Sequence, residues 1–416
     1  MRNNSFNKYL LSPVVFIVAM LVLLEYSCSN EQQISTPDNT PVSVTFTLAN
    51  TRSEAQSEGE GDETQIQEML LLLFRSEKLV QIQPITTLQP GDGMANNYKF
   101  NVLVLSTSRP LRFVFLANTG WQSSQLEELM GKTYSEVIAA LPPFQPEMNA
   151  TGVQNPFPMW GELVREQGVP PATDEEPTIM ANIRLMRAVA KVEITKAPAL
   201  TEQVFRLTSV RLFRCRDMSV VPLLENMSEN ISEFQVVKPT LPPNPDMASI
   251  PTVIESSTLP IRMYAPESKG IAVTEPGWAT ATTVIVVGGF FNAMQQETYY
   301  RIDFIKNGPA EGGAQQVSYG EILRNHHYLF NITEVKSAGC YTPEDAAENA
   351  TCGISLKVAG WIDRPCDFPD VGAGSGGILK VAPWITASSE QYIGSGWSLA
   401  VPWTEGGYNP DVGDAE

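Results

Sequence analysis

The residue types that carry most enzymatic chemistry are scarce in this sequence. Its 416 residues include two histidines, His326 and His327, and these are adjacent. Neighbouring residues of a strand point to opposite faces, so one metal ion cannot easily take both imidazoles as ligands. There is no HExxH motif and no distant histidine that could activate a nucleophile. We therefore expect no catalytic residue, no cofactor and no metal site, and the chain is not expected to be an enzyme.

A glycine-rich segment near the C-terminal end satisfies the pattern GxGxxG at Gly372, Gly374 and Gly377. A dinucleotide-binding fingerprint must follow a strand and open a helix, because the helix N-terminus holds the pyrophosphate. A strand-like run, 378–384, follows here instead. We interpret the segment as a flexible hinge, which begins a C-terminal tail of residues 371–416.

The first of the five cysteines, Cys28, follows an apolar run at positions 10–24. This run is too short to cross a bilayer ~30 Å thick, which takes ~20 helical residues, so residues 1–27 are interpreted as a signal peptide. The segment resembles a bacterial lipoprotein signal, which makes Cys28 the candidate lipidation site and 28–41 a polar tether. The alternative is an ordinary cleaved signal and a free thiol.

Cys340 and Cys352 flank a segment that two strands could enclose as a hairpin. A disulfide between them is geometrically possible in an oxidising compartment. Cys215 and Cys366 are left over, and the alternative for each is a buried thiol.

The charge balance excludes some partners. The chain has 46 acidic and 28 basic residues and a formal net charge of −18. Nucleic acids and anionic membrane surfaces are bound through Lys and Arg patches. We therefore expect no nucleic-acid partner.

The elements that would position any site are mostly strands. Val42, Val44, Phe46 and Leu48 alternate with polar residues, which is typical of a half-buried strand. The run 69–74 is continuously apolar and predicts a strand covered on both faces. Helical spacing occurs at 122–130 and 134–141. Further strands are expected at 98–105, 111–117, 179–185, 189–194, 205–214, 219–223, 261–264, 283–291, 299–305, 327–335 and 354–362. This order of strands indicates β-sandwich architecture.

A short motif recurs near the end of the chain. The sequence Leu-Lys-Val-Ala-Gly-Trp-Ile at 356–362 returns as Leu-Lys-Val-Ala-Pro-Trp-Ile at 379–385, and more weakly before Trp403. One interpretation is a chance match among valine-rich strands. The other is that the tail offers strands for the same kind of groove as the last strand of the preceding domain.

Several segments together resemble the Bacteroidales fimbrillins, the major fimbrial subunits of type V pili. The strand 42–48 is followed by Asn50-Thr51-Arg52, an acidic loop at 53–63 and an apolar strand. The other matching segments are Phe-Leu-Ala-Asn-Thr-Gly at 115–120, Leu-Met-Gly-Lys-Thr at 129–133, Arg-Leu-Met-Arg-Ala-Val-Ala-Lys at 184–191 and Leu-Arg-Asn-His-His-Tyr at 323–328.

The resemblance implies a mainly β fold of two transthyretin-like sandwich domains with a few short helices in the N-terminal one. The expected domains are 42–187 and 188–370. Fimbrillins are exported as lipoproteins to the outer membrane and are cut by an Arg-specific surface protease. The cut corresponds here to the bond between Arg52 and Ser53. A lone loop arginine is usually just solvated, but this one lies between a clean strand and a polar loop.

Removal of the strand Val42 to Leu48 would open an apolar groove for a strand of another fimbrial subunit. The tail is the candidate donor, with Leu379 and Val381 in the groove and Trp384 closing the segment. The rival interpretation is that the tail folds back on its own domain.

Three function classes follow from these observations. The first is a structural fimbrial subunit at the cell surface that serves adhesion or biofilm formation. The second is a tip adhesin or glycan-binding surface lipoprotein that contacts host or bacterial surface ligands, with Trp384, Trp397 and Trp403 as stacking platforms. A pilus anchor is a further alternative within the first class, and an enzyme is the third.

Overall fold

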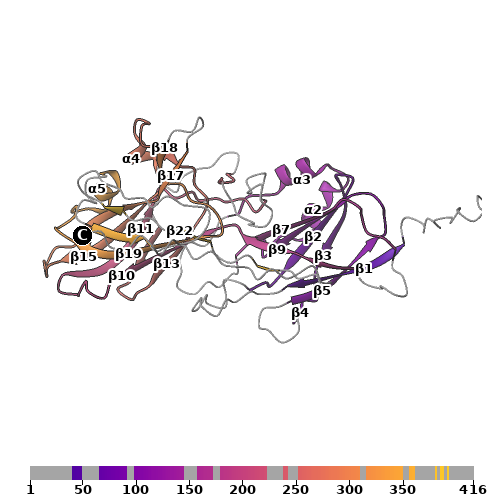
Figure 1. Ribbon diagram of the computed structural model, residues 1–416, viewed down its shortest axis with the longest axis horizontal. Coiled ribbons are helices and arrows are strands. Elements are labelled where there is room, and N and C mark those ends of the chain that lie inside the picture. Colours follow the sequence, from indigo (N-terminus) through magenta and orange to yellow (C-terminus); the bar gives the residue numbers. More distant parts are fainter. Residues whose placement is uncertain are drawn as a thin grey trace, which may run out of the picture.

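The structure is a computed structural model, and it describes residues 40–48, 65–90, 98–144, 157–171, 179–222, 238–241, 252–309, 315–349, 356–360, 380–381, 385–387 and 391–392. The molecule is elongated, with two β-sandwiches along its long axis (Figure 1). The mainly β fold expected from the sequence is confirmed.

Two sheets face each other in the N-terminal sandwich. In spatial order, the first contains β4 (Gln89–Pro90), β5 (Tyr98–Leu105), β1 (Pro41–Leu48) and β8 (Ile179–Asn182). The second contains β21 (Lys380–Val381), β9 (Arg184–Arg187), β7 (Met159–Arg165), β6 (Leu111–Ala117), β2 (Met69–Arg75) and β3 (Lys78–Pro84).

Strand β2 shows how the N-terminal sandwich is layered. Its sequence Met-Leu-Leu-Leu-Leu-Phe is buried at every position, as the continuous apolar run predicts. Leu71 and Leu73 face the other sheet, whereas Leu70 and Leu72 face a second core under the helices. These helices are α2 (Ser123–Leu126), the 3-10 helix η2 (Glu127–Leu129) and α3 (Tyr134–Ala140).

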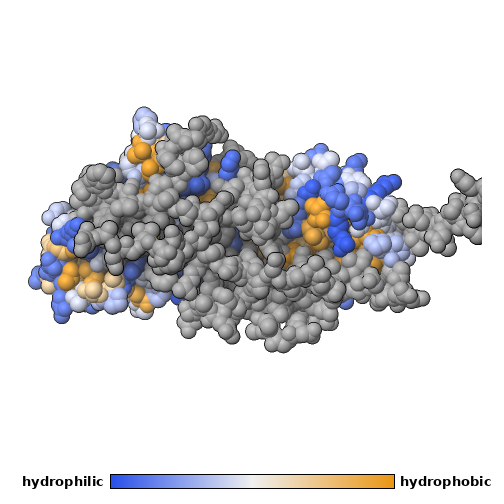
Figure 2. Space-filling model, viewed as in Figure 1, coloured by the Kyte–Doolittle hydropathy of each residue, from blue (hydrophilic) through white to orange (hydrophobic). Residues whose placement is uncertain are grey.

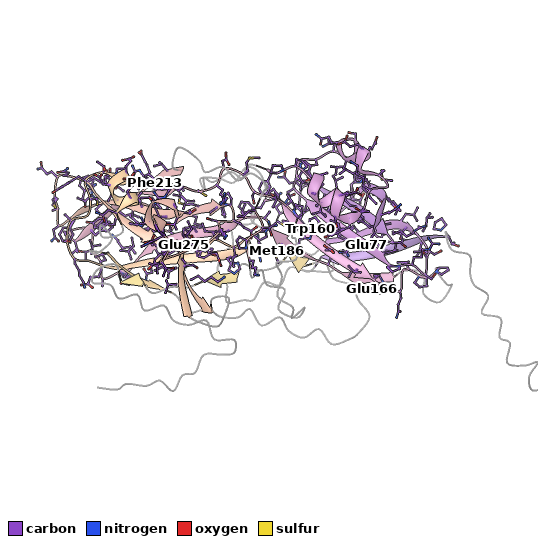
Figure 3. All side chains as sticks on the ribbon, turned by 90° about the horizontal axis from the view of Figure 1, so that it is seen from above. Glu77, Trp160, Glu166, Met186, Phe213 and Glu275 are labelled. Carbon is purple, nitrogen blue, oxygen red and sulfur yellow. The ribbon has the colours of Figure 1, made fainter. Side chains whose placement is uncertain are left out.

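The second core of this sandwich is closed by side chains from several strands. Trp160 on β7 and Met186 on β9 are paired neighbours and are buried in it (Figure 3). A reciprocal capping box between Thr133 and Glu136 begins α3, because each residue bonds to the other's backbone amide.

The C-terminal sandwich also has two main sheets. One contains β13 (Ile261–Ala265), β10 (Ala190–Lys196), β19 (His326–Val335), β20 (Leu356–Gly360) and β23 (Gln391–Tyr392), with β22 (Ile385–Ala387) also paired to β19. The other contains β12 (Thr252–Glu255), β11 (Phe205–Phe213), β15 (Val284–Phe291) and β16 (Thr298–Asp303). Their inner faces form a core of buried side chains from residues 190–335.

A smaller sheet projects from the C-terminal sandwich (Figure 1). It contains β14 (Ile271–Ala272), β18 (Gln315–Tyr319) and β17 (Ile305–Pro309). Helices α4 (Trp278–Ala281) and α5 (Pro343–Glu348) also lie in this half. These two helices were not expected from the sequence, because helices of four and six residues are too short to show a helical period.

The two sandwiches meet through polar and apolar contacts. Arg187 donates a hydrogen bond of 3.0 Å to Asn325 Oδ1. Ser219 and Phe144 form a reciprocal backbone bridge, so the strand expected at 219–223 is a single bridge. The main cores draw on residues on either side of position 187, but the exact domain boundaries stay a prediction.

Hydrophobic residues reach the surface in separate patches on the face drawn in Figure 2. Among the large apolar side chains described, Leu103 and Leu105 on the outer face of β5 are 58% and 41% exposed. In the described part of the chain, no helix has the length and apolar character that crossing a bilayer requires.

Candidate functional site

The candidate site is the position of β1 inside its sheet. β1 runs antiparallel to β5 in an unbroken register from Pro41 opposite Leu105 to Leu48 opposite Tyr98. On its other side it runs parallel to β8, with Val44 opposite Ile179. β1 is therefore an interior strand, although it lies at the start of the described chain.

The inward side of β1 forms part of the sandwich core. Val42 and Val44 are 1% and 0% exposed, and they pack in one cluster with Val102 of β5 and Leu71 of β2. Phe100 of β5, in the same cluster, makes an edge-to-face contact of 5.8 Å with Phe115 of β6. The predicted burial of the first half of β1 is thus observed.

Both ends of β1 are held by contacts with neighbouring strands. At its start, Thr40 N donates to Ser106 Oγ at 2.9 Å, and Ser106 N donates to Thr40 O at 2.8 Å. At its far end, Phe46 pairs with Phe100 and with Ala181 through the strand register. The side chains of Phe46 and Leu48 lie outside the described residues, so their burial stays a prediction.

This arrangement would become a strand acceptor if β1 were removed. Two strands, β5 and β8, would then each expose a row of backbone N–H and C=O groups towards the gap. The gap would also lack the side chains of Val42 and Val44. Burial of each such side chain contributes ~1.5–3 kcal/mol to stability. A strand of matching alternation that enters the gap would recover both the ladder hydrogen bonds and this burial.

The sequence did not predict how β8 is separated from β9. The run 179–185 was expected to be one strand, but it divides at Ile183, which is 1% exposed. β8 pairs with β1 in one sheet, whereas β9 pairs with β7 in the facing sheet. One side of the position of β1 is therefore formed by β8, just before the chain passes to the facing sheet. No local pattern in residues 179–185 shows where the chain changes sheets.

The two histidines do not share a ligand position. His326 is buried, and its Nδ1 lies 2.9 Å from Arg324 O. His327 points to the other face of β19, where its Nε2 lies 3.6 Å from Glu193 Oε2. Burial opposes ionisation of Glu193, but the neighbouring His327, Arg262 and Lys191 outweigh it and lower its pKa to about 2. Among the described residues, no cluster of His, Cys, Asp or Glu could hold a metal ion.

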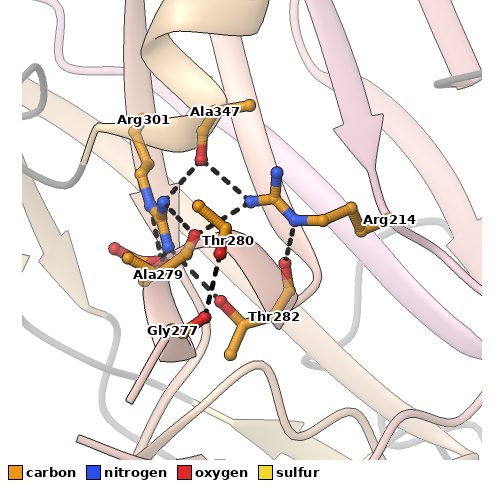
Figure 4. Close-up of polar contacts among 8 residues, drawn as sticks. Arg214, Gly277, Ala279, Thr280, Thr282, Arg301 and Ala347 are labelled. Carbon is orange, nitrogen blue, oxygen red and sulfur yellow. Dashed lines mark hydrogen bonds and ion pairs between the residues drawn. The ribbon is translucent and has the colours of Figure 1, made fainter.

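Two arginines that sequence reasoning missed converge on the ends of two short helices (Figure 4). Arg301 on β16 donates through Nη1 to Ala347 O of α5 at 2.5 Å and to Ala279 O of α4 at 2.7 Å. Arg214 donates through Nη2 to Ala347 O at 2.8 Å and through Nε to Thr282 O at 2.8 Å.

The charges of this arginine pair are partly balanced within the cluster. Asp303 accepts from Arg301 Nε at 2.8 Å. Burial, together with the like charge of Arg301, lowers the pKa of Arg214 to about 10, while Asp303 acts in the opposite direction. The available sequence signal was the spacing of Arg301 and Asp303, which lie two residues apart on one strand and therefore have their side chains on the same face.

A buried ion pair near the junction was also missed. Arg324 and Glu267 are 0% and 1% exposed, and Arg324 Nε donates to Glu267 Oε2 at 2.7 Å. Arg324 also donates to Val220 O and Val221 O at 2.9 and 2.8 Å. The pair therefore ties the start of β19 to two other segments of the chain.

Comparison with known proteins agrees with this architecture. Residues 40–191, which include all of β1 and its slot, match the family model of the major fimbrial subunit protein (FimA). This part of the chain is similar to the major fimbrial subunit family. The resemblance to fimbrillins found in the sequence is thereby confirmed. No curated protein matches the sequence.

Solved structures of fimbrial and adhesion proteins are similar to this chain at low identity. The tip fimbrial protein of Porphyromonas gingivalis, with its C-terminus truncated, is 14% identical with a TM-score of 0.45; the match covers 72% of this chain and 96% of that one. A candidate cell adhesion protein of Parabacteroides distasonis is 12% identical with a TM-score of 0.45, covering 74% and 95%. One from Bacteroides eggerthii is 13% identical with a TM-score of 0.40, covering 78% and 95%.

Several of the site residues predicted from the sequence lie outside the described part of the chain. They are Cys28, Arg52, Ser53, Cys352, Leu379, Trp384, Trp397 and Trp403. Lipidation, cleavage and glycan stacking at these positions therefore stay predictions. Cys340 is disulfide-bonded, whereas Cys215 is free and buried. The pairing of Cys340 with Cys352 also stays a prediction.

The described strands of the tail pair with sheets of their own chain. β21, which contains Val381, runs parallel to β9 at Arg184 and Leu185. β22 runs parallel to the start of β19, and β23 runs antiparallel to β20. Within one chain, these tail strands therefore pair with sheets of both sandwiches. Donation of a tail strand to a second chain stays a prediction.

Proposed function

We propose that the chain is a structural fimbrial subunit that is exported as a lipoprotein, loses β1 by cleavage between Arg52 and Ser53, and polymerises by strand addition into the vacated slot. The observation that supports this proposal most is the interior position of β1. A strand at a sheet edge would leave one free edge when removed, but β1 would leave a gap between β5 and β8.

The chain position of β1 makes its removal simple. Arg52 follows the end of β1 by four residues, so one cut after it would release the whole strand together with the preceding tether. The proposed protease is an Arg-specific enzyme at the cell surface. Cys28 would hold the unprocessed chain at the outer membrane through its lipid, and other fimbrial subunits would be the partners of the processed chain.

The proposed donor is the tail, with Leu379 and Val381 entering the slot of a neighbouring subunit. The glycine-rich hinge at 371–377 would let the tail extend at little conformational cost. Within one chain, β21 already occupies a strand edge through Val381, which supports its capacity to pair. Donation would require this segment to leave β9 and join another chain.

Processing is tested by the N-terminal sequence of the protein recovered from the cell surface. A start at Ser53 is expected for a polymerised subunit. A blocked, acylated Cys28 on assembled fibres would contradict cleavage and would instead indicate an anchor or a precursor.

The role of the cut is tested by Arg52→Ala, with Arg109→Ala as the matched control. Arg109 is an exposed loop arginine just after β5, and each replacement should change stability by no more than ~0.5 kcal/mol. We expect Arg52→Ala to abolish fibres seen by electron microscopy and Arg109→Ala to retain them. Fibres of normal length from Arg52→Ala in the presence of the protease would refute the proposal.

The role of the tail is tested by deleting residues 372–416 from the processed chain. Tail donation predicts a monomer that melts at the same temperature and no longer joins other chains. A tail that serves only its own fold predicts a melting temperature lower by several degrees and unchanged assembly.

A further inference from the structure

Three arginines lie in or beside turns at one end of the N-terminal sandwich. Arg75, the last residue of β2, pairs with Leu111, the first residue of β6. Leu111 pairs on its other side with Arg165, the last residue of β7. Arg109 is exposed in the loop just before β6. The segments 75–78, 106–110 and 165–169 are therefore neighbours, and together they are named the arginine turns.

The arginine turns are held together by backbone contacts. Thr107 N donates to Val169 O at 2.8 Å, and Val169 N donates to Thr107 O at 2.9 Å. Ser76 N donates to Pro110 O at 3.1 Å. A Cβ on Gly168 would lie 2.0 Å from Thr107 O, so two of the turns approach each other as closely as a glycine allows. No one of the three turns can open without breaking a contact with another.

Two of the turns hold the bond after their arginine in a shape that a protease cannot bind, because an enzyme that adds a peptide to its own sheet edge requires that peptide to be extended. Ser76 and Glu77, the latter labelled in Figure 3, have φ of +48° and +64°, so the chain after Arg75 turns back at once. Gly168 N donates to Arg165 O at 3.1 Å and thereby occupies the carbonyl oxygen that an oxyanion hole would have to bind. Cleavage after either arginine therefore requires local opening of the turn.

The bond after Arg109 has a second protection in Pro110. Hydrolysis adds the hydroxyl of water to the carbonyl carbon of Arg109, breaks the C–N bond and transfers a proton to the nitrogen of residue 110. In proline this nitrogen is part of a ring and has no N–H for the protease to bind. Arg109 is exposed, whereas Arg75 and Arg165 are half-buried, so the most accessible of the three arginines is the one that proline follows.

We propose that the arginine turns withstand the Arg-specific protease, so that processing stops after the cut at Arg52 and leaves the sandwich whole. A cut after Arg109 would separate β5, one wall of the slot of β1, from β6 in the chain. β1 ends at Leu48 opposite Tyr98, the first residue of β5, so the chain that leads to Arg52 leaves β1 at the end away from the arginine turns. The proposal rests on the proposed function, because the protease concerned is the one that would cut after Arg52.

In the test, the full-length chain is digested with a purified Arg-specific endoprotease, and the products are identified by mass spectrometry. All variants carry Arg52→Ala, and the unchanged chain is digested in parallel to report the cut after Arg52. The folded Arg52→Ala chain is expected to give no product that begins at position 76, 110 or 166. In urea that unfolds the chain but leaves the protease active, cuts after Arg75 and Arg165 are expected, and none after Arg109. Any of the three cuts in the folded chain would overturn the proposal, whereas an intact bond after Arg52 in the unchanged chain would refute only the proposed function.

Protection by the fold is tested with Gly168→Ala, whose Cβ would collide with Thr107 O. The matched control is Gly120→Ala, because φ is +67° at Gly168 and +69° at Gly120, but nothing lies within 4 Å of the Cβ added at Gly120. We expect the cut after Arg165 to be at least tenfold faster in Gly168→Ala than in the control, with the same circular dichroism spectrum. Equal rates in the two variants would overturn the proposal.

The role of Pro110 is tested by adding Pro110→Ala to Gly168→Ala. A new product that begins at position 110 is expected. Pro170→Ala is the matched control, because Pro170 is also exposed but does not follow an arginine; it should not give this product. A cut after Arg109 while Pro110 is in place, or no such cut after its replacement, would exclude Pro110 as a determinant of the site of cleavage.

A second way of opening the turns is available if Gly168→Ala does not fold. A Gly-Ser pair inserted between Glu166 and Gln167, which are both exposed, lengthens the turn after Arg165 without a collision. Its control is the same pair inserted between Gln295 and Gln296, in an exposed turn without an arginine. The same tenfold difference in the cut after Arg165 is expected, and equal rates would overturn the proposal.

Discussion

Replacing Val44 by alanine probes how firmly β1 is held in the unprocessed chain. Val44 is fully buried between Val102 of β5 and Ile179 of β8 in the strand register. Alanine lacks two of its carbon groups, which at ~0.8 kcal/mol for each buried methylene amounts to about 1.6 kcal/mol. The cavity that remains adds to this, so we expect the free energy of unfolding to fall by about 2–3 kcal/mol.

The matched control for this replacement is Ser43→Ala, one residue earlier on the same strand. Ser43 lies half-buried on the opposite face, so its replacement should change the free energy of unfolding by no more than ~0.5 kcal/mol. Both variants carry Arg52→Ala, which keeps β1 in the chain throughout the measurement.

The assay is urea denaturation followed by circular dichroism, with linear extrapolation to water. A lower midpoint with an unchanged m-value is expected for Val44→Ala. A loss below ~0.5 kcal/mol, equal to that of Ser43→Ala, would refute the reasoning, because β1 would then not be part of the core that holds the N-terminal sandwich together.

Two further predictions concern the C-terminal sandwich. Arg324→Met should lower the free energy of unfolding by about 3–5 kcal/mol because it leaves Glu267 charged and buried; Lys306→Met, which breaks an exposed pair with Glu321, should cost less than ~1 kcal/mol in the same urea titration. Burial lowers the pKa of His326 from 6.5 to about 4, so the unfolded chain binds the proton more readily. Stability should therefore be complete above pH 6.5 and fall as the pH drops towards 4, and His326→Gln should flatten this dependence; equal pH profiles for the two proteins would contradict it.

Local pattern was sufficient where one face of an element is buried or a cap is present. The alternation at Val42 and Val44 predicted β1, and its strand register with β5 runs over the same residues. The helix at 134–140 lies within the predicted 134–141, and the Thr133–Glu136 capping box explains where it begins. Each of these signals comes from residues that are only a few positions apart in the sequence.

Local pattern failed where the partner is distant in sequence. The run at 179–185 reads as one strand, but its halves pair with β1 and with β7 in opposite sheets. The Arg301 and Arg214 side chains meet at Ala347 although they are far apart in the chain. The residues next to each arginine in the sequence do not indicate which carbonyl its side chain contacts.

The sequence by itself determined strands such as β1 and β2 and which of their faces are apolar, because alternation and continuous apolar runs are properties of short segments. It also carried the motifs by which residues 40–191 match the model of the major fimbrial subunit family. The tertiary structure alone decided that β1 lies between β5 and β8 and that the backbone of Cys340 bonds to the outer edge of β16. Those two facts depend on which strands pair across long loops, and backbone hydrogen bonds are chemically alike at every residue, so only packing of the whole chain selects their partners.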